Sequence, residues 1–121
     1  MKLENQVVSL ELAKKMKELG FEQESLFYWI IHRYEPIDLY YFENGINIPF
    51  DDEVSEKYSA YTVAELGEML PINCASWRSD KTLYSCQRFD FGGCCGQEIT
   101  ADTEADCRAR LLIWLKENNY L

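Results

Sequence analysis

The stretch EITADTEADCRARLLIWLKENNYL (98–121) decides the fold of this chain, because a polar lead runs into a dense apolar helix. Carboxylates near its start complement the positive end of a helix dipole, so the helix is predicted to begin near Asp102 or Thr103. Its predicted core positions recur at helical spacing: Ala105, Ala109, Leu112 and Leu115. Leu111, Ile113 and Trp114 widen the apolar surface almost all round, so the helix must be covered on two sides or partly exposed at a subunit contact.

Other helices and several strands are predicted upstream of this stretch. Ser9 is expected to cap a first helix with its hydroxyl, and Gly20 to end it. Thr62-Val-Ala-Glu65 predicts a second helix that begins with a capping box and ends at Pro71. Strand signals predict a strand at Leu26–Tyr34, a hairpin at Asn44-Gly45, a second hairpin turning at Ser79-Asp80-Lys81, and a short strand at Gln97–Thr100.

These elements predict one α+β domain over residues 1–121, with a small antiparallel sheet of hairpins packed against the N- and C-terminal helices. A chain of 121 residues can bury a sufficient core without a metal or a disulfide. Its hydrophobic fraction of 47% is far from the composition of disordered chains. The whole chain is therefore expected to fold.

The cysteine content and the absence of apolar runs bear on the compartment. The N-terminal residues lack the apolar stretch of a signal peptide, and no run approaches the roughly 18 apolar residues of a membrane span. We therefore expect a cytoplasmic protein that does not bind membranes. In that reducing compartment the cysteines are expected to be buried or free thiols without a disulfide: Cys74, Cys86, Cys94, Cys95 and Cys107. No Cys-x-x-Cys pair is present, so neither a metal site nor a cofactor is expected.

Charge is concentrated in one region of the chain. The formal net charge is −9, and residues 35–69 hold nine acidic residues against one lysine. Such a field repels nucleic acid and favours basic partners, although a solvated acidic face that maintains solubility is the simpler alternative. Tyrosines in the same region would add rigid amphipathic contact area. The residues expected to form a protein-binding surface are Tyr40, Tyr41, Asp51, Asp52, Glu53, Glu56, Tyr58 and Tyr61.

No catalytic residue is predicted, and we do not expect an enzyme. His32, the only histidine, lies inside an apolar strand and is expected to be structural. The glycine segment 92–96 lacks the lysine of a phosphate-binding loop, so a hairpin turn is expected there. Two alternative functions stay open. One is an acidic inhibitor that mimics nucleic acid and blocks a host DNA-binding enzyme; the other is a helix-turn-helix-like nucleic-acid binder that uses Arg78, Lys81 and Arg88.

Three blocks, SLELAKKMKELGF (9–21), TVAELGEMLP (62–71) and ITADTEADCRARLLIWLKENNYL (99–121), resemble those of small, functionally uncharacterised proteins encoded in phages and prophages, especially of gut bacteria. The resemblance covers about half of the chain, implies a small α+β domain and assigns no catalytic or binding residue. With the acidic region, it leads us to expect a phage or prophage accessory protein that acts by protein binding. A homo-oligomer formed through the C-terminal helix is a further expectation, because a symmetric dimer would bury the Leu111–Leu115 run.

Overall fold

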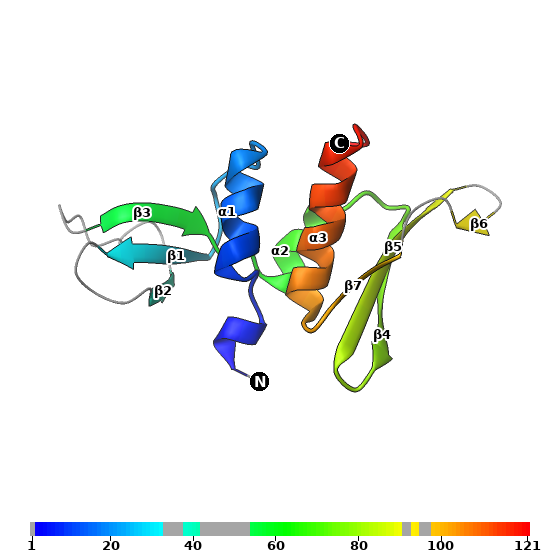
Figure 1. Ribbon diagram of the computed structural model, residues 1–121, viewed down its shortest axis with the longest axis horizontal. Coiled ribbons are helices and arrows are strands. Elements are labelled where there is room, and N and C mark those ends of the chain that lie inside the picture. Colours follow the sequence, from blue (N-terminus) through cyan, green and yellow to red (C-terminus); the bar gives the residue numbers. More distant parts are fainter. Residues whose placement is uncertain (1, 33–37, 42–53, 91–92, 95–97) are drawn as a thin grey trace.

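The computed structural model describes residues 2–32, 38–41, 54–90, 93–94 and 98–121, of which residues 32, 38–41, 54–55, 90 and 93–94 are described by their backbone alone. In chain order the elements are η1 (Leu3–Asn5), α1 (Leu10–Glu18), β1 (Phe27–His32), β2 (Asp38–Tyr41), β3 (Val54–Ser59), α2 (Val63–Met69), β4 (Cys74–Asp80), β5 (Leu83–Asp90), β6 (Gly93–Cys94), β7 (Ile99–Ala101) and α3 (Glu104–Glu117). Figure 1 shows α1, α2 and α3 in the middle of the molecule, with a sheet on either side.

The predicted α+β class is confirmed, but the strands that the structure describes divide between two antiparallel sheets instead of the single sheet expected. One sheet has the strand order β2-β1-β3, and the other is built around β5. The sheet built around β5 packs on one face of α3, and α1 and α2 cover the other face. The β2-β1-β3 sheet packs on α1 through β3, so the helices separate the two sheets.

Strand β1 is the centre of the first sheet and pairs antiparallel with β2 and β3. Within it, the backbone of Tyr28 lies opposite Tyr40 on one side and Ser59 on the other. The indole nitrogen of Trp29 donates to the Val8 carbonyl at 2.8 Å, which ties this sheet to the segment before α1. The predicted strand at Leu26–Tyr34 is thus confirmed over Phe27–His32, whereas the predicted Asn44-Gly45 hairpin lies outside the described residues.

Strand β5 is the centre of the second sheet and pairs antiparallel with β4, β6 and β7. The β4–β5 hairpin turns at residues 81–82, where the Arg78 guanidinium donates to the carbonyls of Asp80 and Lys81 at 3.2 and 2.8 Å. The second predicted hairpin is therefore confirmed, but its turn lies later than the predicted Ser79-Asp80-Lys81, because β4 continues to Asp80. The short strand expected at 97–100 is confirmed over Ile99–Thr100, within β7 (Ile99–Ala101). Gly93–Cys94 pairs with Phe89–Asp90, and the other residues of the glycine segment, where a hairpin turn is expected, lie outside the described residues.

Helix α2 begins with the predicted capping box. The Thr62 hydroxyl accepts from the Glu65 amide at 3.2 Å, and the Glu65 carboxylate accepts from the Thr62 amide at 3.0 Å. Tyr61 and Leu66, which flank the box, are both buried in one core cluster, as a hydrophobic staple requires. The helix ends at Leu70, directly before Pro71.

Helix α3 begins at the predicted place, since the Thr103 hydroxyl accepts from the Asp106 amide at 3.1 Å. Its buried residues belong to two core clusters. Toward α1 and α2 lie Ala105, Ala109, Leu112 and Ile113; toward β5 and β7 lie Cys107, Leu111 and Leu115. All seven are buried, so the Leu111–Leu115 run, except for half-buried Trp114, is covered within the chain itself. The apolar surface on which the expected homo-oligomer depended is therefore not presented by this helix.

Helix α1 shows one error in the sequence analysis. Ser9 stands at the N-cap position, but its hydroxyl makes no capping bond. Its backbone amide instead donates to the Asp106 carboxylate at 2.7 Å. The helix ends as predicted at Gly20, whose φ of +89° lets the Phe21 amide donate back to the Met16 carbonyl.

Candidate functional site

Four glutamates surround a small hollow beside α2. We call this site the acidic hollow; its volume is about 230 Å³ and it is lined by Glu22, Glu24, Tyr61, Glu65, Glu68 and Met69. Glu65 and Glu68 are three residues apart on α2, so they lie on one helix face. Glu22 and Glu24 come from the segment between α1 and β1. Two parts of the chain that are distant in sequence thus bring their carboxylates together.

The four carboxylates differ in what they contact. Both oxygens of Glu65 accept from backbone amides, one from Thr62 at 3.0 Å and the other from Leu26 at 3.2 Å, so Glu65 joins α2 to the segment before β1. Glu22, Glu24 and Glu68 are exposed, and within the described part of the chain none of them pairs with a lysine or arginine. Three negative charges at this site are therefore not compensated by the residues that the structure describes.

Tyr61 forms the buried floor of the acidic hollow and is only 2% exposed. Burial, reinforced by the negative charges of Glu65 and Glu22, raises the pKa of its phenol to about 12, while the nearby Ser59 hydroxyl opposes the rise. Among the described residues its hydroxyl has no hydrogen-bond partner of normal geometry. The prediction that Tyr61 is a surface contact is wrong, because its ring is needed in the core beside Leu66.

The other predicted surface residues are only partly placed. The Tyr58 hydroxyl donates to the Glu56 carboxylate at 2.7 Å, which raises the pKa of Tyr58. Its ring lies under the ammonium groups of Lys14 and Lys17, at 5.8 and 5.0 Å from the ring centroid. Tyr58 is thus already engaged by α1, although Glu56 is exposed. Tyr40 and Tyr41 belong to β2, where only their backbone is described, and Asp51, Asp52 and Glu53 lie outside the described residues.

A larger groove lies between η1, the start of α2, the β4–β5 turn and the start of α3. This mixed-charge groove has a volume of about 860 Å³, and its apolar lining includes Leu3, Phe27 and Val63. Its charged residues do not share one sign: Arg78 and Lys81 come from the hairpin, and Asp102 and Glu104 from the start of α3. It therefore favours no single class of charged ligand.

The structure contradicts the helix-turn-helix alternative. Residues 74–80, which a recognition helix would need, form strand β4. Of the three basic residues expected to meet phosphates, Arg78 and Lys81 lie at the β4–β5 turn, whereas the Arg88 guanidinium stacks over the Tyr120 ring at 4.2 Å. The three cations therefore do not line one helix, as the motif requires.

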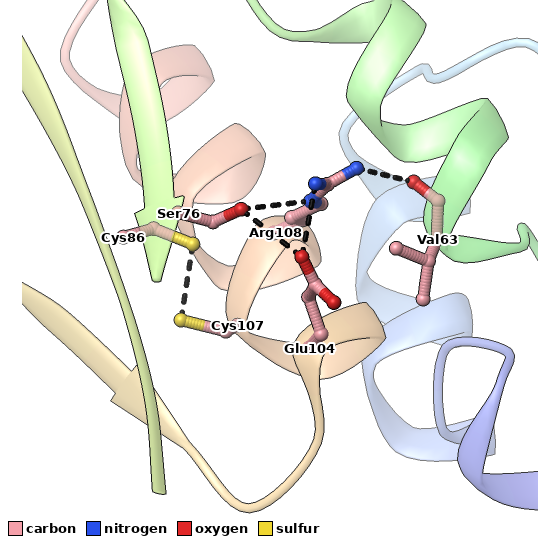
Figure 2. A network of polar contacts seen from close by, with 6 residues as sticks. All are labelled: Val63, Ser76, Cys86, Glu104, Cys107 and Arg108. Carbon is pink, nitrogen blue, oxygen red and sulfur yellow. Dashed lines mark hydrogen bonds and ion pairs between the residues drawn. The ribbon is translucent and has the colours of Figure 1, made fainter. Parts of the chain in front are cut away.

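Arg108 organises a polar network between α3, α2 and β4 (Figure 2). Its guanidinium donates to the Val63 carbonyl at 2.8 Å, to the Ser76 hydroxyl at 3.1 Å and to the Glu104 carboxylate at 3.0 Å. Ser76 in turn donates to Glu104 at 3.2 Å. Arg108, Ser76 and Glu104 each bond to the other two, and Arg108 also bonds to Val63 on α2, so the network holds the helices against the second sheet.

Several other expectations concern sites of known chemistry. In the part of the chain that the structure describes, no group of three or more histidine, cysteine or acidic residues is arranged to hold a metal ion. No described helix is long and apolar enough to cross a membrane. Cys86 and Cys107 are buried thiols as expected, and Cys74 is half-buried. His32 is the last residue of β1, and its side chain lies outside the described part.

The chain matches no family model, no curated protein and no solved structure. The phage or prophage origin implied by the resemblance stays a prediction. Sequence reasoning located Glu65 and Glu68 within the acidic region but missed Glu22 and Glu24. Glu22 and Glu24 are two positions apart, which in extended backbone places both side chains on one side. This spacing is the signal in the sequence that could have linked the two residues.

Proposed function

We propose that this protein binds a partner protein through the acidic hollow, which takes lysine or arginine side chains from a basic segment of the partner. The observation that carries the proposal is the set of three exposed glutamates, Glu22, Glu24 and Glu68, without a described cation beside them. Clustered charge of one sign steers an oppositely charged partner and selects against partners of the same charge. The net charge of −9 adds a long-range field of the same sign.

The mixed-charge groove is larger, but it is the weaker candidate for this role. Its cations and carboxylates lie in the same space, so a basic segment would meet Arg78 and Lys81 there. The acidic hollow presents only carboxylates, a phenol and a thioether. A thioether side chain such as Met69 adapts to the aliphatic stem of a lysine or arginine.

A pair of charge-matched variants tests the proposal. One replaces Glu22, Glu24 and Glu68 with glutamine; the control replaces Glu4, Glu11 and Glu98, which are also exposed but lie outside the hollow. Glu65 is kept in both, because its carboxylate also holds the backbone. A fluorescent lysine-rich peptide should bind the hollow variant roughly tenfold more weakly than the wild type at low salt, since three exposed ion pairs contribute about 0.5 kcal/mol each.

The control should bind almost as well as the wild type, because it loses the same net charge without losing the hollow. Equal weakening in both variants would show that binding follows net charge alone and would refute the proposed site. The same two variants then serve as baits for capture from a bacterial lysate. A captured partner that double-stranded DNA displaces would favour the alternative of a nucleic-acid-mimicking inhibitor.

A further inference from the structure

Two cysteines from different elements meet in the second core cluster. Cys86 belongs to β5 and Cys107 to α3, and their sulfurs are 3.0 Å apart (Figure 2). Both side chains are completely buried. A disulfide bond is about 2.0 Å long, so an approach of roughly 1 Å would bring the two sulfurs to bonding distance.

The hydrogen bonds around the pair give the two thiols different character. The Cys86 thiol donates to the Cys107 sulfur, and Cys107 lies 3.4 and 3.3 Å from the carbonyls of Tyr84 and Ile99, to which its own thiol can donate. The hydrogen bond from Cys86 lowers the pKa of Cys107, and the positive charges of Arg110 and Arg108 lower it further. The same hydrogen bond, together with burial, raises the pKa of Cys86. Cys107 is thus the better nucleophile of the pair, and Cys86 stays a thiol.

We propose that Cys86 and Cys107 form a modification site at which a peroxide closes an intrachain disulfide between β5 and α3. The Cys107 thiolate attacks one peroxide oxygen, the O–O bond breaks, and the sulfur becomes a sulfenic acid while the other oxygen leaves as hydroxide. The Cys86 thiol then attacks the Cys107 sulfur, the S–S bond forms, and the sulfenic hydroxyl leaves as water. The two thiols lose two electrons and two protons, and one hydrogen peroxide molecule becomes two water molecules.

The position of the pair determines what the bond does. Strand β5 and helix α3 pack together through this core cluster, and Tyr84 on β5 and Glu104 on α3 both line the mixed-charge groove. A bond between positions 86 and 107 closes a loop within the folded chain and removes conformational freedom from the unfolded chain. Oxidation would therefore stabilise the domain and fix one wall of the groove. This role is independent of the acidic hollow.

The test uses the full chain with Cys74, Cys94 and Cys95 replaced by serine, so that only the proposed pair remains. After hydrogen peroxide treatment, the intact mass should fall by two hydrogen atoms, and a digest should contain one peptide pair linked through Cys86 and Cys107. The midpoint of thermal unfolding should rise by roughly 5 to 15 °C and return after reduction with dithiothreitol.

Two further variants, Cys86→Ala and Cys107→Ala in the same background, should show neither the mass loss nor the shift in unfolding temperature. Circular dichroism before treatment establishes that each variant is folded. The proposal is overturned if peroxide yields only stable oxygen adducts on Cys107, if the linked peptide is absent, or if both thiols survive conditions that fully oxidise the same chain in denaturant.

Discussion

The backbone amide of Ser9 donates a 2.7 Å hydrogen bond to the carboxylate of Asp106, although the two residues are 97 positions apart in the chain. Asp106 lies in the first turn of α3, and Ser9 is the N-cap residue of α1. Asp106 therefore joins the starts of two helices, since its carboxylate accepts from Ser9 at α1 and its amide donates to the Thr103 hydroxyl at α3. Together with the shared apolar core and the Lys15–Glu117 ion pair, the contact between Ser9 and Asp106 holds α1 beside α3. The two helices lie between the two sheets (Figure 1).

Replacing Asp106 should therefore cost more than replacing Ser9. Asp106→Ala removes a charged acceptor from a partly buried amide and should lower the free energy of unfolding by about 1–2 kcal/mol. Ser9→Ala keeps the backbone amide and removes a hydroxyl that makes no capping bond, so it should change that free energy by less than about 0.5 kcal/mol. Urea unfolding of both variants measures the difference, and equal losses would contradict the assignment of the bond to the backbone.

A second prediction concerns the close approach of Gly67 to Arg108. A Cβ atom on Gly67 would collide with the Arg108 guanidinium, which is held by bonds to Val63, Ser76 and Glu104. Gly67→Ala should thus destabilise the domain by about 1–3 kcal/mol, although alanine is the better helix former.

The Arg108→Ala background is the control for Gly67. Without the guanidinium the collision disappears, and Gly67→Ala should then stabilise α2 by up to about 1 kcal/mol. A double-mutant cycle measured by urea unfolding would show this change of sign. A Gly67→Ala effect of the same sign and size in both backgrounds would rule out the collision as its cause.

A third prediction follows from the raised pKa of Tyr61. The folded pKa is about 12 and the ordinary value is 10.0, so between these values the unfolded chain loses a proton that the folded chain keeps. The contribution to stability is therefore complete below pH 10 and is lost as the pH rises toward 12. Compared with Tyr61→Phe, the wild type should lose stability steadily across this interval.

At neutral pH, Tyr61→Phe should be neutral or slightly stabilising, because it removes a buried hydroxyl that lacks a described partner. Urea unfolding of both proteins at neutral pH and at steps from pH 10 to 12 gives the comparison. Parallel stability curves would mean that the phenol ionises equally well in the folded and unfolded chains.

Features set by neighbouring residues were predictable from the sequence. The capping box of Thr62 and Glu65 needs only four consecutive residues, and the two-sided burial of α3 follows from its own apolar pattern. The division into two sheets was not predictable, because it depends on which partner each strand finds. The acidic hollow was missed for the same reason: Glu22 and Glu24 meet Glu65 and Glu68 only after folding.

The last prediction concerns Asn119, which has a φ of +62° after the end of α3. There the Tyr120 amide donates to the Leu115 carbonyl at 2.8 Å, the same closing bond that Gly20 permits after α1. This turn stacks Tyr120 on Trp114, with ring centroids 5.6 Å apart. The backbone conformation of Asn119 thus controls whether half-buried Trp114 is covered.

Asn119→Gly should keep the turn and leave the free energy of unfolding unchanged or slightly higher, since glycine adopts positive φ without steric cost. Asn119→Val should lower it by about 1–2 kcal/mol, because a β-branched residue is strained in the left-handed region. Only the valine variant should also make Trp114 more accessible to a fluorescence quencher. If glycine and valine had equal effects on stability and quenching, the positive φ would not be what holds Tyr120 against Trp114, and the Arg88 guanidinium over the Tyr120 ring would be the contact left to account for it.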